Sequence, residues 1–505
     1  MAEAGRTKDG AVGRGLARSV SLVGLTALVC APGLWLGASV DSALFVLGGI
    51  RIRDGYVLYR DLFDNKPPGV FVLNALGQTV LPWFDPWFVS WLLTVVFTVA
   101  TVLVVDVLLR RWLSSIAAFF WSVVCLIGIA SHAVALGGGL TESFAILPLV
   151  LALWAVAKPQ ITWRVSALVG CLASLACLLS LQAVPAAAVL VVAAVLVGAK
   201  SANMVPRAMA AIVGGAVVPL IVVGWLGARG ALGDAIDQIV TYNSAYRAAS
   251  SGVGKVLPAA LLLLACMAVP ITIAVVRMVR SPRESDRVLW ICLAWSLAYV
   301  ASLGFQNRLF LHYLIVLVPP MVLLSGPSLE WLVRGTRSPI LKARNGAVGV
   351  VALTMCTFAI SAVVAAGLSG ITMNATAQSK TVIDDTSGWI DAHTSGSSAI
   401  FVWGYDPGIY LAAGRSPRDR YAYLYPPPGY WSQGRTDILL SSWIISPPTV
   451  IVEAPSEVPM FPAPTAQGGS SGYDPLTPLR DFVGSHYRLA AQFGDHDVYL
   501  LISGG

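Results

Sequence analysis

The chain has 505 residues, of which 56% are hydrophobic and 12% are charged, and its mean hydropathy is +0.75. Because a soluble globular domain carries about a quarter of its residues as charged side chains, this composition excludes a water-soluble protein. The net charge of +7 comes largely from basic residues in short loops between apolar segments. Membrane topology explains such a pattern, so we infer no nucleic-acid partner.

Apolar blocks recur along the chain as far as Gly367. Each is about 18 to 25 residues long, enough to cross roughly 30 Å of hydrocarbon, so we predict an α-helical polytopic membrane protein with about 11 spans. The predicted spans are Leu16–Ala38, Pro86–Leu109, Leu113–Ala130, Leu140–Ala157, Val165–Leu181, Ala183–Ala199, Ala208–Ala228, Val256–Val276, Val288–Gly304, Leu309–Val333 and Ala347–Gly367.

Lys and Arg gather in alternate loops between these spans. With the N-terminus in the cytoplasm, 18 of the 33 basic residues fall on the inner side, eight in outer loops and seven in the C-terminal tail. Because cytoplasmic loops are enriched in Lys and Arg, we predict an integral plasma-membrane protein with a cytoplasmic N-terminus and an extracytoplasmic C-terminal domain. The apolar segment Val70–Leu81 is too short for a span and predicts an interfacial or re-entrant helix. Counting it as a span would turn the later basic clusters outward.

Two domains are predicted. Residues 1–370 form a transmembrane body whose first outer loop covers residues 39–85, and residues 371–505 form a small extracytoplasmic α/β domain. A Pro-, Gly- and Ser-rich stretch, Pro462–Pro475, predicts a loop within this domain. From the positions of apolar runs and turn residues, the expected helix and strands of the tail are Thr381–His393, Ala399–Trp403, Thr449–Glu453 and Val498–Ile502.

Asp41 stands where the first predicted span reaches the outer surface, just before the apolar stretch Ser42–Ile50. Asp is a frequent helix N-cap. A carboxylate at a membrane surface can equally serve as a general base, because partial desolvation and nearby charges tune the pKa of such a group. The residues alone leave both roles open.

The segment Asp54–Gly69 concentrates acids, bases and tyrosines in the first outer loop. Pro67 restricts Lys66 to an extended backbone and Pro68 fixes the residue after it, so a stiff segment presents the lysine ammonium. A rigid cation at the lipid boundary suits a phosphate group. The neighbouring acids and aromatic rings suit a sugar.

Two further polar groups face the same side under the predicted topology. Thr141 and Glu142 open a predicted span, where the helix dipole favours an acid without any other function. Arg308 and His312 are four residues apart, so in an α-helix both project from one face. Snorkelling to the interface accounts for one such cation, whereas the pair together with Tyr313 is better explained by an anionic headgroup.

These features form a recognisable set. They are Asp41, the run DLFDNKPPG at residues 61–69, the pair Thr141–Glu142 and the run RLFLHYLIVLVPP at residues 308–320. Together they resemble the polyprenyl-phosphate-dependent glycosyltransferases of the dolichyl-phosphate-mannose protein mannosyltransferase superfamily, which have the GT-C membrane fold. The resemblance covers the membrane body and says little about the C-terminal domain.

The resemblance implies that Asp41 is the catalytic base and that Lys66 lies near the carrier phosphate. Relatives often have a second acid directly after the first, where this chain has Ser42. It therefore stays open whether Asp41 acts alone or with another acid. The candidates for that help are Asp61, Asp64 and Glu142.

The implied reaction moves a sugar, mannose or a pentose, from a polyprenyl-phosphate donor to a glycan, lipid or protein acceptor outside the cytoplasm, with inversion. The leaving phosphate needs charge stabilisation more than protonation. The residues expected to bind the phosphate are Lys66, Arg308, His312 and Arg60, and those expected to hold the sugar or acceptor are Asp61, Asp64, Glu142 and Tyr313. We expect no nucleotide cofactor, because the chain has no Walker or Rossmann glycine motif. The outer acids leave room for a divalent metal, but none is predicted; membrane lipids are the remaining expected partners.

Two other functions compete with this one. A transporter or flippase of a lipid-linked sugar needs the same spans and phosphate-binding groups, but it predicts polar residues near the bilayer midplane, whereas here they cluster at the outer boundary. A non-catalytic assembly protein whose outer domain binds a wall polymer would make Asp41 and Lys66 coincidental. The alternating tyrosines of residues 420–431 are more typical of half-buried strand positions than of a sugar-binding surface.

Overall fold

The structure is a computed structural model. It describes residues 2–249, 253–306, 310–336, 345–423, 430–455, 459–461 and 474–502. The chain divides into two compact units. The first is made of Met1–Trp35, Ser90–Val222 and Ser251–Met373, and the second of Leu36–Val89, Val223–Ser250 and Asn374–Gly505. The described part of the first unit is helical throughout, whereas the second combines helices with a four-stranded sheet.

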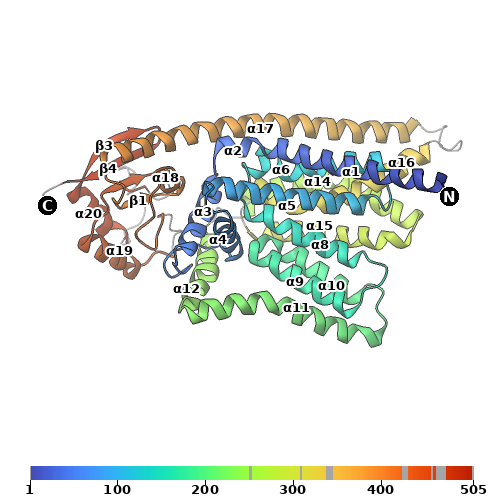
Figure 1. Cartoon of the computed structure of the whole chain (residues 1–505), viewed down its shortest axis with the longest axis horizontal. Helices are drawn as coiled ribbons and strands as arrows, with labels where there is room; N and C mark the ends of the chain where they lie inside the picture. The colour runs from blue at the N-terminus through green and yellow to red at the C-terminus, as the bar shows by residue number, and fades with distance from the viewer. Residues whose placement is uncertain are drawn as a thin grey trace. The chain divides into compact units, whose positions relative to one another are not determined.

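The first unit is a bundle of apolar helices, many of which lie side by side (Figure 1). In chain order they are α1 (Ala2–Cys30), α2 (Pro32–Leu36), α5 (Pro86–Leu109), α6 (Ser115–Ala130), α7 (His132–Ala135), α8 (Thr141–Val156), α9 (Trp163–Leu179), η1 (Leu181–Ala183), α10 (Val184–Leu196), α11 (Ser201–Ala228), α14 (Val253–Arg280), η3 (Glu284–Asp286), α15 (Arg287–Gln306), η4 (Leu311–Leu317), α16 (Val318–Thr336) and the first part of α17 (Asn345–His393). α2, α5, α11 and α17 also carry residues of the second unit.

Six helical stretches of the described residues are long and apolar enough to cross a membrane. They are Gly15–Leu36, Pro86–Leu109, Ser115–Ala135, Ser201–Ala228, Glu284–Leu303 and Leu311–Leu332. Three other predicted spans form the shorter helices α8, α9 and α10, of 16, 17 and 13 residues. At 1.5 Å per residue these measure roughly 20 to 26 Å, less than a hydrocarbon core of roughly 30 Å. The polytopic helical fold is confirmed, while the count of eleven spans stays a prediction.

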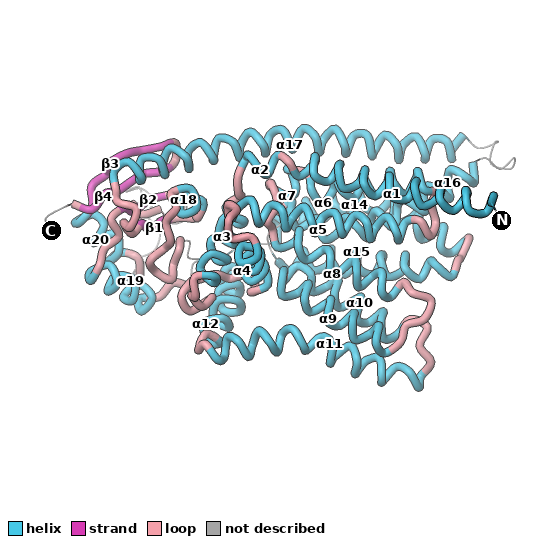
Figure 2. Tube along the Cα trace, in the orientation of Figure 1, coloured by secondary structure: helices cyan, strands magenta, loops and turns pink. Residues whose placement is uncertain are grey.

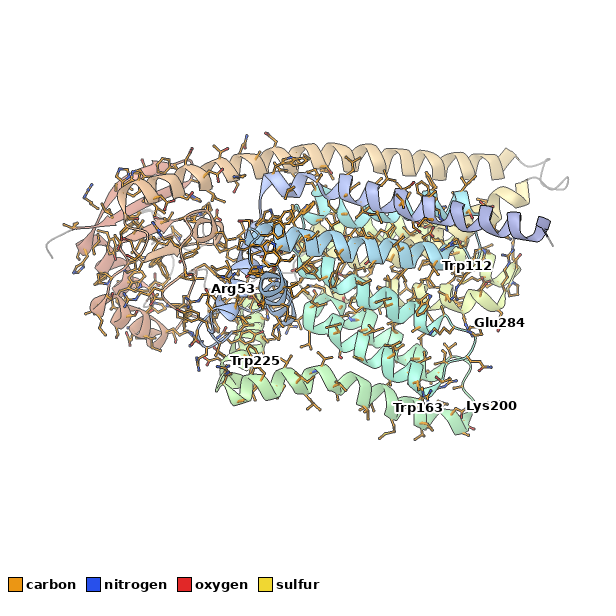
Figure 3. The ribbon with its side chains drawn as sticks, in the orientation of Figure 1. Arg53, Trp112, Trp163, Lys200, Trp225 and Glu284 are labelled. Atoms are coloured by element: carbon orange, nitrogen blue, oxygen red, sulfur yellow. The ribbon has the colours of Figure 1, made fainter. Side chains whose placement is uncertain are left out.

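Four of the loops that were predicted to face the cytoplasm lie at one end of the first unit. Trp112, Trp163, Lys200 and Glu284 mark these four loops, and all lie at that end in Figure 3. A consistent alternation of loops between two ends is what the distribution of basic residues requires. Which side of the membrane this end occupies stays a prediction.

Arginine side chains form ion pairs and hydrogen bonds between the helices at this end. Asp106 pairs with Arg110, one turn away in α5, at 3.2 Å and with Arg18 of α1 at 3.1 Å. Arg111 donates a hydrogen bond of 2.6 Å to the Ala157 carbonyl. Basic residues at this end therefore pair with a buried acid and satisfy a helix C-terminal carbonyl.

The second unit contains one helical hairpin (α3 and α4), a short helical segment (α12, η2 and α13) and the C-terminal α/β part. Its elements are α3 (Val40–Arg53), α4 (Gly69–Val80), α12 (Leu232–Ile236), the π-helix η2 (Asp237–Tyr242), α13 (Asn243–Ala249), the end of α17, β1 (Ile400–Trp403), α18 (Gly408–Ala412), α19 (Gln433–Ile445), β2 (Val450–Glu453), α20 (Thr477–His486), β3 (Tyr487–Phe493) and β4 (His496–Leu501).

The sheet, whose strands are magenta in Figure 2, has the order β1-β2-β4-β3. β1 and β2 are parallel, and the other pairs are antiparallel. The three predicted strands correspond to β1, β2 and β4, and the predicted helix Thr381–His393 is the end of α17. β3 was not predicted, because six of its seven side chains are exposed or only partly buried and such an edge strand has no apolar run. Most of the predicted loop Pro462–Pro475 lies outside the described residues.

α3 and α4 form the hairpin that carries the predicted outer-loop site. α4 corresponds to the predicted short helix Val70–Leu81, whose interfacial or re-entrant position stays a prediction. It lies so close to α3 that a Cβ atom on Gly49 would be 2.7 Å from the Asn74 Cβ. The Phe45 and Phe71 rings meet edge to face with centroids 5.4 Å apart. This packing holds both ends of the loop between the two helices.

Candidate active site

Asp41 lies in the first turn of α3, and Ser39 is the N-cap of this helix. The Ser39 side chain accepts a hydrogen bond from the Ser42 backbone N–H at 3.3 Å. The interpretation of Asp41 as an N-cap is therefore wrong, because the serine two residues earlier satisfies that backbone donor. The Asp41 carboxylate instead accepts a hydrogen bond of 2.5 Å from the Tyr405 hydroxyl.

The loop between α3 and α4 is held by a buried tyrosine in a left-handed conformation. Tyr59 has φ +71° and is fully buried, and its hydroxyl donates to the Lys66 carbonyl at 2.8 Å. Gln238 of η2 donates to the Tyr59 carbonyl at 2.7 Å. A non-glycine residue in this region of φ persists only where its surroundings hold it, so the path of the loop up to Lys66 is firmly determined.

Asp64 is the most buried acid of this loop, with 1% of its surface exposed. Its Oδ1 accepts a hydrogen bond from the Lys66 backbone N–H at 2.7 Å, and its own backbone N–H donates to Gln238 at 2.9 Å. Burial is the main reason why the pKa of the Asp64 carboxyl is raised to about 7. The backbone N–H and the ammonium of Lys66 lower this pKa, and the Asp41 carboxylate raises it.

Lys66 is followed by two buried prolines, and Pro68 is the N-cap of α4. The backbone after Lys66 is therefore fixed by these prolines and by the start of α4. The charges of Asp41 and Lys66 both act on the pKa of Asp64, so the three charged groups lie near one another. Three of the predicted site residues are therefore brought together within the second unit.

Two tyrosines of the C-terminal part complete this neighbourhood. Tyr405 and Tyr423 pack edge to face with ring centroids 4.9 Å apart. The pKa of both phenols is raised by burial first and then by the Asp41 and Asp64 carboxylates. Neither was a predicted site residue. The available signal was the dipeptide Gly404-Tyr405 directly after a buried strand, a place where turns often carry functional side chains.

Arg60 and Asp61 are engaged with each other. The guanidinium donates to both carboxylate oxygens at 2.8 Å, and this pairing lowers the pKa of the Asp61 carboxyl below its usual value. The carboxylate also accepts from the Val57 backbone N–H at 2.8 Å. Both side chains therefore have a structural role in the loop, whatever ligand they meet.

The remaining predicted site residues belong to the first unit. Glu142 is buried in the first turn of α8 and accepts a hydrogen bond of 3.1 Å from Ser180. His312 and Tyr313 lie in η4, a 3₁₀-helix, and the Tyr313 carbonyl accepts from the Tyr299 hydroxyl at 2.6 Å. Arg308 lies outside the described residues.

The expectation of α-helical spacing at His312 was wrong. The α-helix begins only at Val318, because Pro319 and Pro320 are tolerated in a first turn but not in a helix interior. Residues 311–317 take the tighter 3₁₀ form instead.

The tyrosines of residues 420–431 that the structure describes are buried. Tyr421, Tyr423 and Tyr430 surround the Phe63 ring with centroids 5.5 to 6.1 Å away. They form part of the core that joins the outer loop to the C-terminal part. Within the described part of the chain, no three His, Cys, Asp or Glu side chains are close enough together to ligate a metal ion.

No protein-family model matches the chain, and no curated protein matches it. Among solved structures, ArnT from Cupriavidus metallidurans bound to undecaprenyl phosphate has a TM-score of 0.62 and 14% identity, over 96% of this chain and 98% of the ArnT chain. The chain has the GT-C fold. The apo state of the same ArnT also has a TM-score of 0.62 and 14% identity, over 97% of this chain and 99% of its own. At this identity the similarity concerns the fold, which is the fold that the sequence resemblance implied.

A further solved structure is less similar. The oligosaccharyltransferase AglB from Archaeoglobus fulgidus, in complex with an inhibitory peptide and a dolichol-phosphate, has a TM-score of 0.48 and 13% identity. The match covers 86% of this chain and 69% of AglB.

Proposed function

We propose that this protein is a membrane glycosyltransferase that moves a sugar from a polyprenyl-phosphate donor to an acceptor hydroxyl outside the cytoplasm, with inversion. The observation that carries the proposal is the centre of Asp41, Asp64 and Lys66 in the second unit. It lies on a fold shared over the whole chain with ArnT, which was crystallised with undecaprenyl phosphate. A base and a cation are the two groups that this transfer requires.

In the proposed reaction Asp41 takes the proton of the acceptor hydroxyl. The acceptor oxygen then forms a bond to the anomeric carbon, while the bond from that carbon to the phosphate oxygen breaks. The electron pair leaves with the polyprenyl phosphate. Since the leaving group is already an anion, a fixed cation stabilises it better than an acid would, and Lys66 supplies this charge from a backbone that is held by Tyr59 and Asp64.

Asp64 has a supporting part in this proposal. Its Oδ1 holds the Lys66 backbone, while Oδ2 is buried and accepts no hydrogen bond from the described residues. A carboxyl with a pKa of about 7 can be ionised beside the lysine ammonium and neutral when an anionic phosphate approaches. This property limits the repulsion between Asp64 and the donor.

The other predicted residues keep their assignments as part of the proposal. Arg308 and His312 are further candidates for the phosphate, and Glu142 and Tyr313 for the sugar or the acceptor. Arg60 and Asp61 are the weaker candidates, because each already binds the other. We also propose that the donor sugar is mannose or a pentose and that the acceptor is a glycan, a lipid or a protein, as the sequence resemblance implies.

A transporter of a lipid-linked sugar is the less favoured function. The buried charged residues of the first unit that the structure describes are Asp106, Glu142, Arg207, Arg277 and Asp286. All are within the first or last two turns of their helices or in η3. A transporter in which broken helices bind ions or substrate predicts such groups near the bilayer midplane instead.

The test uses the purified full-length protein in lipid nanodiscs with a panel of polyprenyl-phosphate sugars and acceptors. We expect the wild type to transfer sugar from at least one donor. Asp41→Asn should lower kcat on the order of 100-fold or more, the range for loss of a general base. The matched control is Asp54→Asn, which changes an exposed acid at the other end of α3 and should leave transfer unchanged.

Two results would overturn the proposal. Equal transfer by wild type and Asp41→Asn removes Asp41 as the base. No transfer from any donor, combined with movement of a lipid-linked sugar across the bilayer of reconstituted vesicles, identifies a transporter.

A further inference from the structure

We propose that Tyr405 is a positioning residue of the catalytic centre, which holds the Asp41 carboxylate through Oδ1 so that Oδ2 faces the acceptor hydroxyl. The inference rests on the proposed function and deepens it, since it gives the C-terminal α/β part a place in the reaction. The hydroxyl-to-carboxylate distance is 2.5 Å, typical of a hydrogen bond to an ionised acceptor. Oδ1 is the carboxylate oxygen that receives this hydrogen bond.

The backbone aims Tyr405 at Asp41. β1 ends at Trp403, and Gly404 follows with φ +113°. A Cβ atom on Gly404 would lie 2.3 Å from the Ala454 carbonyl oxygen, so only glycine fits this turn. Because β1 is buried along its whole length, the turn and the tyrosine that follows it are fixed by the sheet.

The chemistry of Tyr405 suits a donor. Burial of the phenol and the neighbouring Asp41 carboxylate raise the pKa of Tyr405 well above its ordinary value, so the hydroxyl keeps its proton at any physiological pH. A phenol that keeps its proton fixes the orientation of a carboxylate without competing for the proton of the acceptor. The ring of Tyr423 packs against Tyr405 and limits its movement.

Attachment of the C-terminal part to the outer loop does not depend on this hydrogen bond. Arg51 donates to the Pro417 carbonyl at 2.7 Å, and the Phe63 backbone N–H donates to the Arg420 carbonyl at 2.7 Å. Arg420 also pairs with Asp234 at 2.8 Å. Removing the Tyr405 hydroxyl should therefore leave the second unit assembled.

The test is a double-mutant cycle of Tyr405→Phe and Asp41→Asn in the full-length protein. Tyr405→Phe keeps the ring and should lower kcat roughly 10- to 100-fold, as expected for loss of a hydrogen bond to a charged group, while KM for the donor changes less than about twofold. In the Asp41→Asn background the same change should have no further effect on kcat, because the two residues act as one unit. The matched control is Tyr410→Phe, which removes a buried hydroxyl that accepts a hydrogen bond from Val402 at 3.1 Å.

The positioning role of Tyr405 and the proposed glycosyltransferase activity can fail independently of each other. If the wild type transfers sugar and Tyr405→Phe transfers it equally well, or loses the same factor in both backgrounds, the inference is overturned and the function stands. If the wild type transfers nothing, the function is overturned, and the cycle is then measured through the thermal unfolding midpoint. Non-additive shifts in Tm support the pairing of Tyr405 with Asp41, whereas additive shifts overturn it.

Discussion

The Asp64 carboxylate accepts a hydrogen bond from the backbone N–H of Lys66 at 2.7 Å, so a buried acid and the candidate phosphate-binding lysine share one turn. Gln238 holds the backbone of the same acid from outside the loop. Loop geometry, loop charge and the ionisation of Asp64 are therefore coupled.

Ionisation of Asp64 should make stability depend on pH. The pKa of this carboxyl is about 7 in the folded chain and about 3.9 in an unfolded chain. Between about pH 4 and pH 7 the unfolded chain releases a proton that the folded chain retains, so the free energy of unfolding contributed by this group falls as pH rises. Above pH 7 the loss is complete.

Asp64→Asn should remove this dependence, because the amide oxygen can still accept from Lys66 but cannot ionise. We expect the variant to gain in Tm over the wild type at both pH values, and to gain clearly more at pH 8 than at pH 5, as measured in detergent. Asp54→Asn is the control, because its side chain is 42% exposed. A Tm difference between Asp64→Asn and wild type that is the same at both pH values would contradict the assignment.

Loss of the Lys66 charge should weaken use of the donor. Lys66→Met keeps the length of the side chain, and we expect kcat/KM to fall on the order of 100-fold, as for the loss of one group that stabilises charge in a transition state. Lys66→Arg should recover part of the activity, because the charge is restored with a different geometry. Lys380→Met, at an exposed lysine paired with Asp384, should behave like wild type. Full activity of Lys66→Met would exclude a role for this ammonium.

Removal of the Gln238 amide should loosen the loop. The side chain is fully buried and bonds both Asp64 and the Tyr59 carbonyl. Gln238→Leu leaves a buried donor without its partner, which costs about 1 to 3 kcal/mol, so we expect a lower Tm and reduced transfer. Gln433→Leu, which removes an exposed amide that donates to Asp437 at 2.7 Å, is a fair comparison. Unchanged Tm in Gln238→Leu would show that the loop is held in another way.

The contact between α3 and α4 should not tolerate a side chain at Gly49. A Cβ atom there would be 2.7 Å from the Asn74 Cβ and 3.0 Å from the Ala75 backbone nitrogen, so Gly49→Ala must push α4 away at a cost of about 1 to 3 kcal/mol. Since α4 begins next to Lys66, transfer should fall as well. Gly388→Ala in α17, where nothing lies within 4 Å, should leave Tm unchanged or raise it. Equal Tm values for the two variants would contradict this packing.

Part of the site could be predicted from sequence because the relevant residues are neighbours in the chain. The run from Asp61 to Gly69 combines acids, a lysine and two prolines, and proline restricts the backbone wherever it occurs. The presentation of Lys66 follows from that restriction alone. The charge of Asp64 in the folded protein does not, because its burial depends on Gln238, 174 positions away.

The sequence by itself determined the membrane class, the positions of the apolar helices and the alternation of loops between two ends. Each of these needs only about 20 consecutive side chains and the cost of placing charge in hydrocarbon. Only the tertiary structure decided that Ser39 caps α3, that Asp41 meets Tyr405 across 364 positions, and that Asp64 is buried. Such contacts depend on the joint packing of a helix hairpin, a π-helix and a sheet edge, and no local pattern in the chain specifies how those elements meet.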